Sequence, residues 1–241
     1  MTKYILSSIF IFFSVSTAFS QTVEEIVDLH INAIGGYENL AKVQTVKIDA
    51  VSSVGGYDIP VTIYLKKPNN LLLEINVQGM TMKQAYDGTS AWTINPFQGN
   101  SDPEVLKGPT AKALIRLSDL DGPIVNFKDK GYTAELIGKE KIENVETYNI
   151  KLTDKDGDYI NYFIDTENFM LIKQSSVIKD GEKSITSTSS FTNYKPVEGV
   201  VVAYNILSTS SDNPMGPQKI NISAYTPNIE IDNSIFVMPT K

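Results

Sequence analysis

The sequence contains no cysteine, and it has one histidine and one arginine among its 241 residues. Without cysteine there is no disulfide, no thiol nucleophile and no residue to carry an N-terminal lipid anchor. A histidine-based catalytic triad would need His30 beside a nucleophile and a carboxylate. The G-x-S-x-G, H-E-x-x-H and G-x-x-x-x-G-K-[ST] motifs do not occur. The sequence therefore predicts that the protein is not an enzyme, with no catalytic residues and no cofactor.

Basic residues are the minority charge. There are 21 Lys and Arg against 28 Asp and Glu, which gives a formal net charge of -7. An acidic chain repels the phosphate backbone of nucleic acids, and it lacks the basic face that an anionic membrane surface attracts. We therefore expect no nucleic acid among its partners.

The acidic stretch Asp154–Asp158 superficially resembles a calcium loop. An EF-hand loop that starts at Asp154 needs glycine at its sixth position and glutamate at its twelfth. Those positions hold Tyr159 and Asp165. Asp156-Gly157 between two alternating segments is instead typical of a hairpin turn, so no metal site is predicted.

Residues 1–20 have the pattern of a secretory signal peptide. Lys3 is positive, Ile5–Val15 is apolar, and Ala18-Phe19-Ser20 offers small residues for cleavage. The apolar stretch is shorter than the roughly 20 residues that span a bilayer. We expect cleavage and export to the periplasm, where residues 21–241 would be soluble, with no stable membrane span and no lipid anchor. An uncleaved anchor helix is the alternative.

The exported part is expected to begin with one helix. Thr22 and Glu25 have the spacing of a capping box, and Gly35-Gly36 supplies a stop. Between them the apolar stripe of a helix is formed by Val23, Ile26, Val27, His30 and Ile34. A short helical turn over residues 37–41 follows.

Apolar and polar residues then alternate, which is typical of a sheet with one dry face and one wetter face. The clearest alternating segments are 46–50, 59–65 and 71–77. Further strands are expected at 132–138, 146–153, 159–165, 170–178, 184–194, 200–209 and 218–225. We predict one mainly β domain over residues 21–241. Its strongly curved antiparallel sheet of about eleven or twelve strands would form an incomplete, half-open barrel.

Residues 102–123 interrupt the alternation. Asp102-Pro103 resembles the first two positions of a helix, and Asp121-Gly122-Pro123 resembles its end. Because this segment lies between two runs of strands, we expect it to fold across the sheet as a central helical lid.

Five landmarks follow one another along the chain. They are residues 34–40 after the first helix, Tyr86-Asp87-Gly88 before Ala91-Trp92, residues 120–123, Asn193-Tyr194 before Val197-Glu198-Gly199, and residues 231–239. In this order and spacing they resemble the LolA-like superfamily of outer-membrane lipoprotein-sorting proteins and periplasmic lipoprotein carriers. The resemblance spans nearly all of residues 21–241.

The resemblance implies an incomplete barrel around plugging helices, with an apolar concavity that receives acyl chains of a lipoprotein or another lipid. It also implies an inner-membrane donor, an outer-membrane acceptor and a role in outer membrane biogenesis. The best-known carriers place an arginine in the cavity. Here the one arginine, Arg116, lies in the central helical segment, which departs from that pattern.

The apolar side of the first strands is the expected ligand-binding surface. Burying a methylene is worth about 0.8 kcal/mol, so a ~16-carbon chain gains on the order of 12 kcal/mol before ordering costs. The candidate residues of the apolar cavity are Ile59, Val61, Ile63, Leu65, Leu71, Leu73, Ile75, Val77, Met80, Met82 and Trp92. The candidate lid residues are Leu106, Leu114 and Leu117. For any one of them, a place in a closed core is the alternative.

Two functions fit this interpretation. The first is a soluble periplasmic carrier of lipoprotein acyl chains or other lipids. The alternative is a sensor of lipids or lipoproteins with the same fold, in which ligand occupancy changes the contact with a regulatory or assembly partner. An enzyme is the least favoured class.

Overall fold

The computed structural model describes residues 21–181 and 183–240, so the predicted signal peptide lies outside the described residues. No helix in the described part of the chain is long and apolar enough to cross a bilayer. The helices are α1 (Val23–Ala33), α2 (Gly36–Lys42) and α3 (Gly108–Leu117), with short 3-10 helices η1 (Pro96–Gln98) and η2 (Asn233–Phe236). The first strands are β1 (Thr45–Val54), β2 (Tyr57–Lys66), β3 (Asn70–Val77), β4 (Met80–Tyr86), β5 (Ala91–Asn95) and β6 (Asn100–Val105). The later strands are β7 (Thr133–Ile142), β8 (Val145–Thr153), β9 (Tyr159–Asp165), β10 (Leu171–Asp180), β11 (Lys183–Val197), β12 (Val200–Ser210) and β13 (Gln218–Pro227).

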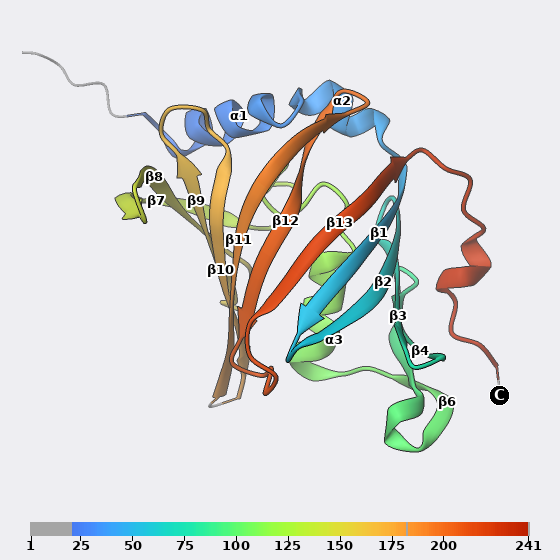
Figure 1. Ribbon diagram of the computed structural model, residues 1–241. Coiled ribbons are helices and arrows are strands. Elements are labelled where there is room, and N and C mark those ends of the chain that lie inside the picture. The colour runs from blue at the N-terminus through green and yellow to red at the C-terminus, as the bar shows by residue number, and fades with distance from the viewer. Residues whose placement is uncertain (1–20, 182, 241) are drawn as a thin grey trace, which may run out of the picture.

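All these strands belong to one antiparallel sheet. Their order is β6-β5-β4-β3-β2-β1-β13-β12-β11-β10-β9-β8-β7. The edge strands β6 and β7 do not pair with each other among the described residues, so the curved sheet remains a half-barrel (Figure 1). The predicted fold class is confirmed, with 13 strands in place of eleven or twelve.

Strands β6 and β7 are consecutive in the sequence but lie at opposite edges of the sheet. The chain between them, residues 106–132, must therefore cross the open side of the half-barrel. This crossing segment contains α3, which lies within the curve of the sheet, behind β13 and β1 in Figure 1. α3 contacts β10 on one side and β4 and β5 on the other. The predicted helical lid across the sheet is confirmed.

The start of that helix differs from the prediction. Asp102-Pro103 lies in β6, and α3 begins at Gly108 with Pro109 in its first turn. A proline is tolerated in an edge strand, because one side of such a strand has no partner that needs its missing N–H. The prediction of a helix start at Asp102-Pro103 is therefore wrong, and α3 begins after Lys107 without a side-chain cap.

The predicted capping box of α1 is confirmed. The Glu25 amide donates to Thr22 Oγ1 at 3.2 Å, and the Thr22 amide donates to Glu25 Oε2 at 2.9 Å. The turn between α1 and α2 then rests on the β11–β12 turn. The Val201 amide donates to the Ile34 carbonyl at 2.9 Å, and a Cβ on Gly35 would lie 2.4 Å from the Gly199 carbonyl oxygen. This contact fixes the two helices over the upper end of the sheet.

The sheet packs on both faces, as the neighbours Leu71 and Leu72 of β3 demonstrate. Leu71 points inward and packs in one cluster with Leu114 of α3. Leu72 points outward and packs with Phe236 of the C-terminal segment, residues 228–240. A third cluster joins α1 and residues 124–127 to the inner side of β8 and β9. We call the side that faces α3 the inner face.

Two adjacent glycines allow a test of the helix–turn contact. Gly35 and Gly36 both have positive φ, +127° and +81°, but the nearest atom to a Cβ on Gly36 is 3.7 Å away. We expect Gly36→Ala to lower the free energy of unfolding by about 1–2 kcal/mol, from backbone strain alone. Gly35→Ala adds a clash with backbone and should cost about 3 kcal/mol or more. Urea unfolding of both variants measures the difference, and equal losses would contradict the contact.

Candidate functional site

A mainly apolar pocket of about 320 Å³, open to solvent on one side, lies between the inner face and the first two helices. We call it the inner pocket. Its floor is formed by residues of β1 and β10–β13, namely Ile48, Leu171, Phe191, Tyr194, Val200, Val201, Val202, Ala203, Ile206, Ile222 and Tyr225. Its cover is formed by His30, Ile34, Leu40, Val43, Leu120 and Asp121. The volume falls in the range of roughly 300–1,000 Å³ that is typical of small-molecule sites.

The floor owes part of its shape to an irregularity in β11. Asn193 has a φ of +57°, a left-handed conformation that asparagine tolerates better than most residues. Because of this break in the regular alternation, Phe191 and Tyr194 both line the inner pocket although they are three positions apart. The Tyr194 hydroxyl donates to the Leu171 carbonyl at 2.6 Å. The aromatic ring therefore contributes to the floor while its polar atom is satisfied by the backbone.

The phenol groups of the floor are held neutral. Burial raises the pKa of Tyr194 above its ordinary value. Burial and then the nearby Asp121 raise the pKa of Tyr225 to about 12. Both side chains therefore present an uncharged surface to the inner pocket at physiological pH.

The crossing segment is tied to the helices where it covers the inner pocket. Lys67, in the β2–β3 turn, pairs with Asp121 at 2.9 Å and donates to the carbonyl of Leu40 at 2.9 Å. Lys130 pairs with Asp119 at 2.6 Å. These contacts hold Leu120 against the pocket from the side of the crossing segment.

His30 is the most buried polar residue of the cover. Its side chain is 4% exposed, and its Nδ1 lies 2.8 Å from the carbonyl oxygen of Phe169. A carbonyl only accepts hydrogen bonds, so Nδ1 carries a proton and donates it. Burial lowers the pKa of His30 below 6.5, against the smaller opposing effect of this hydrogen bond. His30 is therefore a neutral packing residue of α1, as its place in the sequence indicates.

The predicted cavity residues on β2–β4 share the inner face but do not line the inner pocket. Leu65 and Leu71 are buried against α3 in closed core. The half-buried ones are Ile59, Val61, Ile63, Leu73, Ile75, Val77 and Met82. Met80 is exposed at the β3–β4 turn. Their assignment as ligand contacts remains a prediction.

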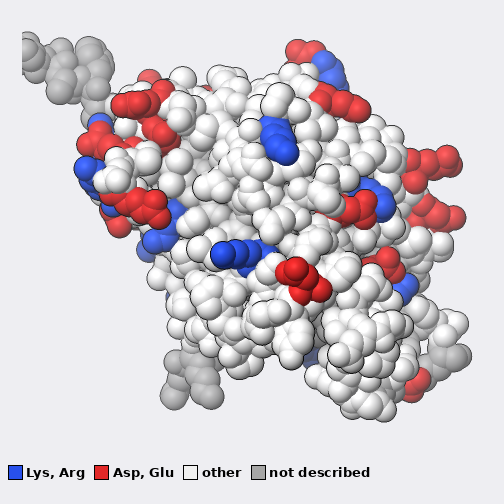
Figure 2. All heavy atoms as spheres, viewed as in Figure 1, with Lys and Arg blue, Asp and Glu red and all other residues white. Residues whose placement is uncertain are grey.

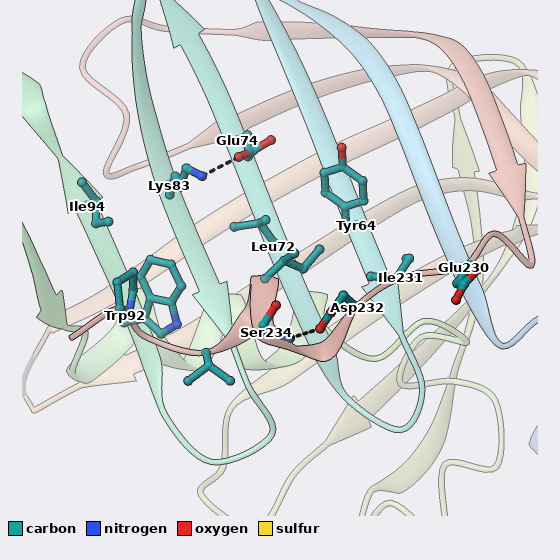
Figure 3. A pocket seen from close by; sticks show the side chains of 13 residues that line it. Tyr64, Leu72, Glu74, Lys83, Trp92, Ile94, Glu230, Ile231, Asp232 and Ser234 are labelled. Carbon is teal, nitrogen blue, oxygen red and sulfur yellow. Dashed lines mark hydrogen bonds and ion pairs between the residues drawn. The ribbon is translucent and has the colours of Figure 1, made fainter.

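Trp92 lies on the other face of the sheet, so its predicted place in the cavity is wrong. It packs with Leu72 and Phe236, and its Nε1–H donates to the Phe236 carbonyl at 2.7 Å. The cause is the alternation of β5, where Ala91 faces inward and Trp92 outward. Figure 3 shows Trp92 and Leu72 beneath the C-terminal segment, in a separate pocket of about 540 Å³.

The three predicted lid residues behave differently. Leu114 is buried against β1–β3, and Leu106 packs on the same cluster. Leu117, at the end of α3, is 48% exposed and does not contribute to the closed core. The residues of the cover that sequence reasoning missed, Leu40, Val43 and Leu120, come from segments that carry no sheet alternation.

Arg116 of α3 lies outside the inner pocket. It lines a charged cleft of about 1050 Å³ between α3, the β2–β3 turn and the β8–β9 hairpin. The ion pairs that fasten α3 to the hairpin are Lys112–Asp158 at 2.9 Å, Lys112–Asp156 at 3.3 Å and Arg116–Asp154 at 3.7 Å. The predicted hairpin turn is confirmed, since Asp154 Oδ1 accepts the amides of Asp156 and Asp158. These acidic residues therefore hold α3 against the β8–β9 hairpin.

Comparison with known proteins places this architecture in a class. No protein-family model and no curated protein matches the chain. A solved LolA superfamily protein from Nitrosomonas europaea is 16% identical, with a TM-score of 0.61 over 90% of this chain and 98% of that one. A DUF1329 family protein from Desulfovibrio piger is 15% identical, with a TM-score of 0.62 over the same shares. A putative outer membrane lipoprotein-sorting protein domain from Vibrio parahaemolyticus is 10% identical, with a TM-score of 0.57 over 88% and 94%.

These likenesses show that the chain has a LolA-like fold. The predicted resemblance is thereby confirmed for the fold. At 10–16% identity the comparison carries no individual residue across, so the site is defined by the geometry of this chain alone.

Burial of His30 predicts a pH dependence of stability. Its pKa is about 6.5 when unfolded and lower when folded. Above pH 6.5 both states are neutral. Below it the unfolded state binds a proton that the folded state excludes, so stability falls by up to about 1.4 kcal/mol per pH unit. His30→Asn keeps a donor near Nδ1 and should flatten this slope between pH 6.5 and 5. Urea unfolding across that range measures it, and an unchanged slope would assign the effect to other groups.

Proposed function

We propose that this chain is an exported periplasmic carrier that shelters an acyl chain of a lipoprotein or another lipid in the inner pocket, on its way towards the outer membrane. The observation that carries the proposal is a mainly apolar pocket on the inner face of a half-barrel, beside the core that packs on α3, where the helices leave space above the sheet. The fold it shares with a lipoprotein-sorting domain supports the same class of cargo. In this proposal residues 21–241 act as one unit after removal of residues 1–20.

The chemistry of the wall supports an acyl ligand. Hydrocarbon side chains make up most of the lining, and the Tyr194 hydroxyl and His30 Nδ1 are already bonded to backbone carbonyls. An acyl chain that replaces water in such a space gains free energy from every methylene it buries. Asp121 is the one carboxylate of the lining, and its pairing with Lys67 reduces the charge that a ligand would meet.

The cover supplies a route for entry. Its residues come from α1, α2 and the crossing segment, while the floor comes from the sheet. A modest displacement of the crossing segment, at the cost of the Lys67–Asp121 pair, would widen the inner pocket without disturbing the strands. The inner-membrane donor and outer-membrane acceptor belong to the proposal as the partners that load and unload the cargo.

Two neighbouring residues of β12 provide the direct test. Ile206 lines the inner pocket, whereas Leu207 is 45% exposed on the opposite face. We expect Ile206→Trp to fill part of the pocket and to weaken binding of a dansyl-labelled undecanoic acid at least tenfold. The matched variant Leu207→Trp should bind within twofold of the unmodified chain. Equal affinities for the two variants would place the ligand elsewhere.

The dependence of affinity on ligand length is a second test. Each methylene that enters the pocket adds up to about 0.8 kcal/mol, which is roughly a fourfold gain in affinity. Competition with saturated fatty acids of increasing length should therefore show a steep rise, and then a plateau once the pocket is full. An affinity independent of length would contradict acyl binding. Native mass spectrometry with lipid extraction, on protein from the cell envelope, would then identify the cargo, and a stable protein partner without lipid would favour the sensor.

A further inference from the structure

Four hairpins of the sheet each carry an exposed large apolar residue at the tip. They are Tyr57 after the β1–β2 turn, Met80 after the β3–β4 turn, Phe97 in η1 between β5 and β6, and Met215 in the loop between β12 and β13. Their side chains are 66%, 43%, 45% and 50% exposed. Single exposed apolar residues are common on protein surfaces. One on each of four hairpins is a pattern.

The four hairpins are neighbours at one end of the sheet. In the sheet order they form the consecutive pairs β6-β5, β4-β3, β2-β1 and β13-β12. Alternate turns of an antiparallel meander lie at the same end of the sheet. The β1–β2, β3–β4 and β5–β6 turns are therefore together at one end. Ser53 near the end of β1 pairs with Lys219 near the start of β13, so the β12–β13 loop adjoins them. A Cβ on Gly55 would lie 3.2 Å from the Met215 methyl carbon, so these two tips touch. We call Tyr57, Met80, Phe97 and Met215 the apolar rim.

The apolar rim is continuous with the inner face. From Tyr57, the inward residues of β2 are Ile59, Val61 and Ile63. On β3 the inward residues are Val77, which pairs with Met80, and Ile75, which pairs with Met82. All five are half-buried apolar side chains. An apolar path therefore runs from the rim towards α3, along residues that the sequence pattern singles out and the inner pocket does not use.

The occupant that fits this rim is a lipid bilayer. A stable protein interface buries roughly 800 Å² on each partner in one contiguous patch, and four single apolar side chains among glycine, asparagine and serine do not supply one. Separate aromatic and apolar side chains do suit the interfacial layer of a membrane, where aromatic side chains gather. Figure 2 shows that charged side chains are sparse in the lower part of this view, where these hairpins lie.

Local charge selects the kind of bilayer. Asp58 is next to Tyr57, and Asp212 lies three positions before Met215. Lys83 lies three positions after Met80, but it pairs with Glu74 at 2.9 Å, and Lys219 lies four positions after Met215. Carboxylates next to the tips repel an anionic surface. We propose that the apolar rim docks on a zwitterionic bilayer surface, with Tyr57, Met80, Phe97 and Met215 inserted between the headgroups. The docking stands on the rim alone, and its purpose, lipid exchange along the inner face, rests on the proposed function.

Vesicle binding tests the docking with a matched control. The rim variant replaces Tyr57, Met80, Phe97 and Met215 with serine. The control variant replaces Tyr37, Val105, Ile137 and Val237 with serine, since these are also exposed apolar residues and none lies on the four hairpin tips. In flotation assays with phosphatidylcholine vesicles, the rim variant should partition at least tenfold less than the unmodified chain, and the control within twofold. Equal losses in both variants, or no binding by the unmodified chain, would overturn the proposal.

A second variant tests the docking even if the rim variant does not fold, because it gives a positive fluorescence signal on membrane contact. Native Trp92 is 1% exposed and packed beneath Phe236, so its emission should be insensitive to lipid. Phe97→Trp keeps an apolar tip, and brominated phosphatidylcholine should quench the added emission. Absence of quenching, or binding only when anionic lipid is present, contradicts docking on a zwitterionic surface.

Membrane docking by the apolar rim and acyl binding by the inner pocket can be tested independently of each other. Affinity for the dansyl-labelled acid, measured without vesicles, reports the inner pocket, and the rim variant should retain it within twofold. Loss of vesicle binding with retained acid binding supports both proposals. A rim-dependent membrane contact without any acid binding would leave the docking intact and remove the carrier.

Discussion

The structure depends on how the inner face of an unclosed sheet is kept from water. A closed barrel hides its interior by pairing its edges, but here the edges are β6 and β7, which are joined only through the chain. That chain crosses the opening, and its Leu114 packs in one core cluster with the inward side chains of Leu65 and Leu71. The crossing segment therefore shields the inner face from water, as the pairing of the edge strands does in a closed barrel. One segment covers a strip, however, and the inner face on either side of it is less tightly closed.

The two sides of that strip differ. Towards β10–β13, α1 and α2 extend the cover, and the inner pocket remains between helices and sheet. Towards β2–β4 no helix adds to α3, so residues such as Val61 and Ile75 remain half-buried. The outer face of β2–β5 is closed by the C-terminal segment, which Trp92 and Lys66 hold through the carbonyls of Phe236 and Ile231. Sheet, crossing segment and C-terminal segment thus leave a row of half-buried apolar side chains along the inner face of β2–β4.

Local pattern predicts most of this architecture and little of the site. The capping box at Thr22, the alternation of β1–β3 and the turn at Asp156-Gly157 are short-range signals, and each is where it was expected. Alternation says which residues share a face, but it does not say which stretch of that face stays empty. Ile63 and Ile48 are paired neighbours with the same pattern, yet only Ile48 lines the inner pocket, because α2 and Leu120 happen to lie above it. The prediction that Trp92 lies in the cavity was wrong for a related reason. A short strand without clear alternation does not reveal on which face of the sheet an aromatic residue lies.

The wall of the inner pocket determines what kind of selectivity the site can have. Its histidine and Tyr194 direct their polar atoms to the backbone carbonyls of Phe169 and Leu171. A guest therefore meets mainly hydrocarbon, and hydrophobic burial is non-directional and scales with area. Such a wall discriminates by the length and bulk of an apolar chain and only weakly by the headgroup attached to it. In the proposed carrier, discrimination among cargoes would then come from surfaces outside the pocket, namely the crossing segment, the charged cleft and the apolar rim.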